Sequence, residues 1–507
     1  MRKLPTIAIR TLAPLMIVAV IPFMPGHATT TQAGGLVVTT TDDSGSGSFR
    51  DALGQAMTNV GADTITFDPT TFPPGNPATI HATAVYEVDG PAASDPLTIS
   101  ALGAGVIFDF TGVTEGQAAF DFEPDGAING LTMKNFTIQN YTPDTNHQGH
   151  GIEIGFAQPS VSNLDIENMT ITGNSEDGLF LNAEENFEGL IESNHITDNG
   201  GVGIHISAGT ASGLFIQEND ITGNGSKGID LDVTDPDVAS TAFITANTVS
   251  DNSNDGIFIG GPETTNAIHA TISNNVTFGN GGIGINLLGF GNEFGGVTEN
   301  DAGDTDAGAN DLLNFPVLNG VSQTGIVGIA CANCTIEIFL SDNDPTGYGE
   351  GQTFVASGTA DGGGNFDVEG CVAANASVTA TATDPIGNTS EFALNYTVPS
   401  STCSGLHTQG DLDCDGDVDG RDALAALIYR SNTDPQLSQE PGCLEIGQNT
   451  QPVSIGIQGS TYFGDVNCSG LVDETDALMI LWYAAHGDHP LPRPIDCTPI
   501  GGPISIT

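Results

Sequence analysis

The chain has 507 residues, with 9 Lys plus Arg against 63 Asp plus Glu, so its formal net charge is −54. This shortage of basic residues argues strongly against nucleic acid as a partner, because phosphate binding needs clustered Lys and Arg. It argues against anionic membrane surfaces for the same reason. Apolar residues make up 38% of the chain, and 67 Gly with 27 Pro favour a mainly β, turn-rich protein.

The first 28 residues are predicted to be a signal peptide. A basic start is followed by the apolar stretch Leu12–Met24 and by the small-residue sequence Gly26-His27-Ala28. This apolar stretch is too short to remain as a membrane anchor, and no later run of about 20 apolar residues predicts a membrane span. We therefore expect a secreted protein, either extracellular or associated with the cell surface.

A short helix is predicted near the start of the mature chain. Ser48 is a suitable N-cap, and Asp51 stands three residues later as its capping-box partner. The apolar residues that follow have the spacing of one helix face, which must be buried. We expect this face to cover the open end of a sheet stack; it consists of Phe49, Ala52, Leu53, Ala56 and Met57.

A repeat occupies the middle of the chain. The pattern N-x-[IV]-x-x-N-x-x-x-G-I-x-[IL] fits fully at Asn194–Ile206, Asn219–Leu231 and Asn247–Ile259. Such a period predicts a parallel β-helix, in which Ile and Val point inward and Asn side chains form ladders at the corners. The glycines of the repeat, at spacings of 27, 25, 25, 28 and 28, are Gly151, Gly178, Gly203, Gly228, Gly256 and Gly284.

Residues 35–318 resemble the right-handed parallel β-helix of secreted bacterial proteins of the pectate-lyase-like kind. The opening DSGSGSFRDAL at Asp43–Leu53 is similar to the capping segment of these proteins. The sequence ENDAGDTDAGANDLLNFPVL at Glu299–Leu318 is similar to the segment that closes them. The resemblance implies the fold, and it leaves the activity open because this fold hosts many chemistries.

Residues 319–400 are predicted to form a small β-sandwich. Thr335–Leu340 and Ser377–Thr383 alternate like half-buried strands. The sequence at Thr379–Phe392 is similar to the last strands of bacterial Ig-like modules. Cys331 and Cys334 form a lone CxxC, for which a disulfide is favoured over zinc because two further ligands are missing. Cys371 and Cys403 are predicted as a second disulfide pair.

Two calcium loops are predicted in the last hundred residues. Each places oxygen-bearing side chains at alternating positions and Gly at position 6, the arrangement that converges ligands on a hard cation. In both loops the residue at position 7 contributes a backbone carbonyl, and in the first loop this residue is Asp417. The side-chain ligands expected are Asp411, Asp413, Asp415, Asp419 and Asp422 in the first loop, and Asp465, Asn467, Ser469, Asp473 and Asp476 in the second.

The cysteines repeat with the calcium loops. Cys414 and Cys443 are 29 residues apart, and so are Cys468 and Cys497. The simplest pairing joins the cysteines within each copy.

The duplicated calcium loop resembles a type I dockerin domain over residues 404–500, and this resemblance implies calcium as cofactor and a cohesin as protein partner. Ser469 replaces the Asp expected at position 5, so the second site should be weaker. The positions that usually contact cohesin are Gly420-Arg421 in one copy and Glu474-Thr475 in the other. This mismatch argues against symmetric docking in two orientations.

One outward-facing line of residues is the candidate ligand site of the β-helix. In each coil the residue between two inward apolar positions points outward, and successive coils are about 4.8 Å apart. A line of aromatic and polar groups at this spacing suits a polysaccharide, although an ordinary solvated sheet face is the alternative. The line consists of Glu153, Phe180, His205, Asp230, Phe258 and Asn286.

Whether the β-helix is an enzyme stays open. A binding protein for carbohydrate or a surface partner is favoured over a glycoside hydrolase, and a lyase is less favoured because Lys134 and Lys227 are the only bases that the coils offer. Gly149-His150-Gly151 is similar to a polygalacturonase motif, but the Arg-x-Lys that accompanies it is missing. Glu153 and Asp230 are three coils apart, about 14 Å, which is too far for a pair of catalytic carboxylates.

Overall fold

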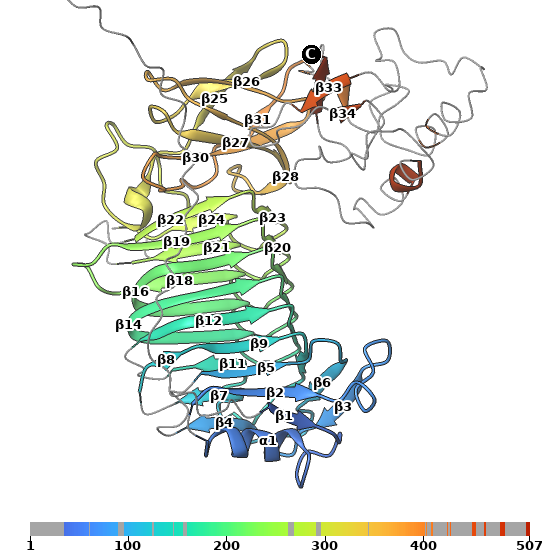
Figure 1. Ribbon diagram of the computed structural model, residues 1–507. Helices are drawn as coiled ribbons and strands as arrows, with labels where there is room; N and C mark the ends of the chain where they lie inside the picture. The colour runs from blue at the N-terminus through green and yellow to red at the C-terminus, as the bar shows by residue number, and fades with distance from the viewer. Residues whose placement is uncertain are drawn as a thin grey trace, which may run out of the picture.

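The computed structural model describes residues 35–400 except 60, 90–95, 124–125, 146, 156–159, 262–267, 290–295 and 343. Beyond residue 400 it describes 402, 407–408, 423, 426, 449–452, 461–462, 477–481 and 503–506. Its main body is a stack of coils, each built from three short strands, and a second group of strands lies at the C-terminal end of the stack (Figure 1). None of the helices in these parts of the chain has the length and apolar character needed to cross a membrane.

The coils form three parallel sheets, and β14 (Leu179–Glu192) and β16 (Ile204–Gln217) run through the first and the second. Besides these two strands, the first sheet consists of β4 (Tyr86–Asp89), β7 (Ala118–Glu123), β11 (His150–Ile154), β18 (Ile229–Val233), β21 (Ile257–Gly260) and β24 (Ile285–Leu287). The second adds β1 (Gly35–Val38), β2 (Asp63–Phe67), β5 (Leu97–Ser100), β8 (Ile128–Asn129), β9 (Leu131–Lys134), β12 (Val161–Glu167), β19 (Ser240–Thr245) and β22 (Ile268–Ser273). The third sheet, of eight strands, consists of β3 (Ala78–His81), β6 (Val106–Asp109), β10 (Thr137–Gln139), β13 (Thr170–Thr172), β15 (His195–Thr197), β17 (Asp220–Thr222), β20 (Thr248–Ser250) and β23 (Val276–Phe278).

Helix α1 (Phe49–Ala56) covers the N-terminal end of the stack, as predicted (Figure 1). Ser48 caps it by accepting a hydrogen bond from the Asp51 amide, while the Asp51 carboxylate accepts one from the Gly47 amide. Phe49 is fully buried and packs edge-on against Tyr86 at 4.8 Å between ring centroids. The predicted apolar face therefore anchors the cap in an aromatic cluster.

The repeated glycines mark places where neighbouring coils approach too closely for a side chain. A Cβ atom on Gly203 would lie 2.5 Å from Ile221 Cγ2 and 2.7 Å from the Gly228 carbonyl oxygen. Inside the coils, apolar columns such as Ile204, Ile229 and Ile257 are fully buried. The glycines thus allow the coils to close tightly around their core.

Two asparagine ladders run along the corners on either side of the third sheet. In one, Asn194 Nδ2 donates to Asn219 Oδ1 at 2.9 Å, and the contact repeats in the next two coils. In the other, each Asn backbone amide and Nδ2 donate together to the Oδ1 of the next coil. This second ladder runs through Asn174, Asn199, Asn224, Asn252 and Asn280.

The chain after the β-helix forms two small antiparallel sheets with a shared core. A turn of 3-10 type, η2 (Ala309–Leu312), precedes them. One sheet is β25 (Val317–Val321), β26 (Gly325–Ile329) and β29 (Asn365–Glu369); the other is β28 (Gly351–Thr359), β27 (Thr335–Ser341), β30 (Ser377–Thr383) and β31 (Tyr396–Thr397). The predicted strands are present, and the likeness to Ig-like modules stays a prediction. Cys331 and Cys334 form the predicted disulfide.

Three glutamates of this following part cap the last coil of the β-helix. Glu350 ends the second ladder by accepting from the Asn280 amide (2.9 Å) and from Asn280 Nδ2 (2.6 Å). Glu337 accepts from the Asn274 amide, and Glu391 accepts from the amides of Leu287 and Thr298. The carboxylates thus take the donors that a further coil would have taken.

The C-terminal region is described only in pieces, among them a small sheet of β32 (His407–Thr408), β35 (Pro503–Ile506), β33 (Asn449–Pro452) and β34 (Thr461–Tyr462). Both predicted calcium loops, 411–422 and 465–476, lie outside the described residues. So do the cysteines of the predicted pairs 414–443 and 468–497. Cys371 is disulfide-bonded, and Cys403, predicted as its partner, is not among the described residues.

We predict that Glu350→Gln destabilises the β-helix by about 1–3 kcal/mol, because the new amide leaves one Asn280 donor buried without an acceptor. Denaturant unfolding of the full chain measures this change. The matched control is Glu369→Gln at the exposed end of β29, which should leave the unfolding free energy nearly unchanged. Equal losses in both variants would show that the ladder does not depend on its terminal acceptor.

We further predict that stability falls as the pH rises from about 6 to 8. Burial raises the pKa of Glu337 to about 7 and the pKa of Glu350 and Glu391 to about 8. In the unfolded chain these groups ionise near pH 4.3, so the folded state holds more protons in this window and loses that advantage as the pH increases. Unfolding free energies at a series of pH values should show a flatter slope for Glu391→Gln. A parent protein that gains stability over this range would contradict the assignment.

Candidate functional site

The register of the first sheet brings the predicted line of residues together. Glu153 pairs with Phe180, Phe180 with His205, His205 with Asp230, and Asp230 with Phe258, each on the next strand. The line continues to Asn286 at one end and to Asp121 and Glu87 at the other. Neighbouring members are therefore about 4.8 Å apart along the stack.

The ring of Phe180 is covered by two histidines. The His150 ring stacks on it at 4.7 Å with an angle of 11°, and the His205 ring meets it edge-on at 5.0 Å. A sugar ring needs a free aromatic face for stacking, which this arrangement does not offer. Phe180 thus acts as a spacer between two polar groups and does not form an open platform.

Asp177, from the corner before β14, orients His205. Its Oδ2 lies 3.0 Å from His205 Nδ1, and its Oδ1 accepts from the Val202 amide. Burial lowers the pKa of His205, but the hydrogen bond to Asp177 and the charge of Asp230 outweigh it and raise the pKa. Burial lowers the pKa of His150 to about 4, so this histidine is neutral. The two rings therefore differ in charge near neutral pH.

Lys227 holds the next part of the line. Its ammonium donates to Asp230 Oδ2 at 2.8 Å and lies 3.4 Å from the centroid of the Phe258 ring. The salt bridge and the cation–π contact both occupy this lysine. Lys227 is thus a positioned part of the surface, where the sequence suggested a solvated corner.

Asp121 is the functional candidate that the sequence did not indicate. It lies beside Glu153 in register, and both residues are buried, with 8% and 1% of their surface exposed. Among the described residues, nothing hydrogen-bonds to Asp121 Oδ1 or Glu153 Oε2. Burial and nearby acidic groups raise the pKa of Asp121 to about 7 and that of Glu153 to about 8.

A signal for Asp121 was present in the sequence. Phe120 and Phe122 flank it, as Ile152 and Ile154 flank Glu153, and all four are buried in the same core. The repeat pattern could not extend to it because Ala118, which pairs with His150, is 32 residues earlier and follows no repeated Asn and Gly.

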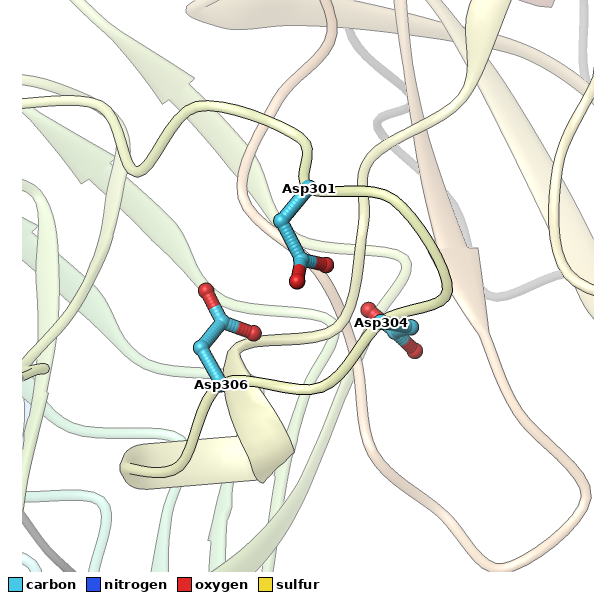
Figure 2. A group of neighbouring side chains, drawn as sticks. All are labelled: Asp301, Asp304 and Asp306. Atoms are coloured by element: carbon cyan, nitrogen blue, oxygen red, sulfur yellow. The ribbon is translucent and has the colours of Figure 1, made fainter.

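Three aspartates in the loop after the β-helix form a separate acidic group. Figure 2 shows Asp301, Asp304 and Asp306 gathered on one loop, with carboxylate oxygens within 4.8 Å of one another. Three oxygens from one loop have the chemistry of a hard-cation site. Asp301, however, already accepts from the Thr305 amide and hydroxyl, and Asp304 accepts from the Asn314 amide. These bonds explain the loop without an ion, so we assign none to it.

The comparisons with known proteins agree with the fold. The family described as "Right handed beta helix region" matches residues 118–300. A search of curated proteins finds no match to the chain. The match and the parallel register of the three sheets establish that this protein contains a right-handed parallel β-helix.

Proposed function

We propose that this is a secreted carbohydrate-binding protein whose first sheet grips a glycan chain. The observation that carries the proposal is the unbroken register that places Glu153, Phe180, His205, Asp230 and Phe258 in one line. Charged and amide groups at this regular spacing suit a polymer with many hydroxyl groups better than a compact ligand. A surface partner other than a glycan would meet the same polar groups without using their period.

Binding of the full chain to an array of soluble glycans tests the proposal. We expect His205→Ala combined with Asp230→Asn to weaken binding at least about tenfold, since each change removes a charged hydrogen-bonding group. The matched control is Asp220→Asn in the third sheet, where Asp220 pairs with His195. Equal weakening by the control, or no glycan binding by the parent, would contradict a site on the first sheet.

A glycoside hydrolase is the second candidate, and Asp121 is the observation in its favour. Asp121 and Glu153 are on adjacent strands, about 4.8 Å apart. Retaining glycosidases hold their two carboxyl groups about 5–5.5 Å apart, with the pKa of one raised so that it can act as an acid. The sequence had offered only the distant Asp230 as a partner for Glu153.

The hydrolase candidate requires new reducing ends from a polysaccharide. Their release by the parent protein, with loss in Glu153→Gln, would establish hydrolysis. Binding without any release would leave the protein a binder.

For the C-terminal region we propose a dockerin-like module that binds two calcium ions and attaches the protein to a cohesin. The support is the duplicated loop sequence and its resemblance. The first loop has five side-chain carboxylates at ligand positions against three in the second, and more ligand charge means tighter binding at similar rigidity.

Calorimetric titration of the full chain with calcium tests this module. We expect two ions, with the tighter one lost in Asp411→Ala and the weaker one lost in Asp465→Ala. Glu445→Gln, outside both loops, is the control. Calcium binding that none of these variants alters would show that the loops are misread.

A further inference from the structure

The first sheet carries a cluster of carboxylates at its N-terminal end, which we call the acidic patch. Glu87, Asp121 and Glu153 are neighbours in one outward column of β4, β7 and β11. Asp89 and Glu123 are paired in the next outward column. Glu87, Asp89 and Glu123 are exposed, whereas Asp121 and Glu153 are buried among them.

No cation of the described chain neutralises the acidic patch. The Lys and Arg residues in these parts of the chain are Arg50, Lys134 and Lys227, and each is bound elsewhere. Their partners are Asp43 for Arg50, Asp165 and Glu167 for Lys134, and Asp230 for Lys227. The nearest histidine, His150, is neutral because burial lowers its pKa.

Unpaired acidic residues are common in so acidic a chain, so their number alone indicates nothing. The second observation is the pair of buried oxygens, Asp121 Oδ1 and Glu153 Oε2, that accept no hydrogen bond from the described residues. Buried polar atoms without a partner are rare in folded proteins and need an explanation, of which a missing ligand is one. Both oxygens belong to the column that the proposed function assigns to a glycan.

We propose that the glycan bound by this sheet is cationic, an amino sugar polymer with free primary amines, and that Asp121 and Glu153 bind its ammonium groups. This inference rests on the proposed function and names its ligand class. A primary ammonium donates up to three hydrogen bonds, so it can serve both unpaired oxygens. The exposed Glu87, Asp89 and Glu123 attract further amines of the same chain.

The spacing of the acidic patch favours ammonium groups over one bound metal ion. Among the described residues, only Asp301, Asp304 and Asp306 bring three ligand atoms within 4.8 Å of one another. The acidic patch does not assemble such a set, and a hard cation such as calcium takes six to eight oxygen ligands. Carboxylates spread along three strands suit charges that are themselves spread along a polymer. The same carboxylates repel polyuronates.

Calorimetry of the full chain with glucosamine oligomers tests the inference, with N-acetylglucosamine oligomers and oligogalacturonate of equal length as comparisons. We expect binding of the glucosamine oligomer alone, weakened at least tenfold in the double variant Asp121→Asn, Glu153→Gln. Raising the salt concentration should weaken it as well. The control Asp198→Asn removes an exposed charge at a corner of the third sheet and should bind like the parent. Thermal unfolding should show that the double variant is folded.

The other outcomes separate the two proposals. Equal or tighter binding of the acetylated or uronate oligomers would overturn the cationic ligand and leave glycan binding by the sheet intact. Binding of no glycan in any arm would overturn both. Calcium uptake that the double variant lacks and Asp198→Asn keeps would assign the unpaired oxygens to a metal and overturn the inference. Unchanged glucosamine binding in a folded double variant would move the site away from Asp121 and Glu153.

Discussion

Every coil of this β-helix depends on the next one for its hydrogen-bond acceptors. An asparagine at each corner donates its backbone amide and its Nδ2 forward and accepts the same two donors from behind, as Asn224 does with Asn252 and Asn199. A ladder of this kind cannot end on solvent-free space, because its last donors would be buried without acceptors. Glu350 meets that requirement, since its two carboxylate oxygens match the two donors of Asn280. The part of the chain after residue 318 is therefore a structural continuation of the stack.

The ladder also explains why the outward line is straight. Register along the stack is set at the corners and by the glycines that admit no Cβ, so the residues between them have no freedom to shift. His205, Asp230 and Phe258 consequently follow one another without a register shift. The charge pattern on this surface is thus held by the backbone, and its side chains lock one another further through Asp177 and Lys227.

The sequence predicted this arrangement well where the repeat is regular. Asn, Gly and β-branched residues recur because each meets a local steric or hydrogen-bonding need, so the coils from Asn194 to Ile259 could be aligned by counting. Asp121 escaped that count because its coil keeps the alternation of Phe120 and Phe122 but not the corner residues. The covered faces of Phe180 could not be predicted either, since His150 reaches the ring from a corner 30 residues earlier. Burial of an outward-facing carboxylate is likewise a property of the assembled surface and leaves no local pattern.

The corner between the first and second sheets differs from the two ladder corners. In β14 and β16 the chain passes it as one continuous strand, whereas residues 234–239 separate β18 from β19. The pairing offset between consecutive coils changes there from Ile204↔Ile229 to Leu214↔Ala242, while the asparagines on both sides keep their contacts. Chain length can thus vary at this one corner without disturbing the rest of the coil. Evolution can lengthen loops there, beside the line of polar residues, and so reshape the surroundings of a ligand while the scaffold stays constant.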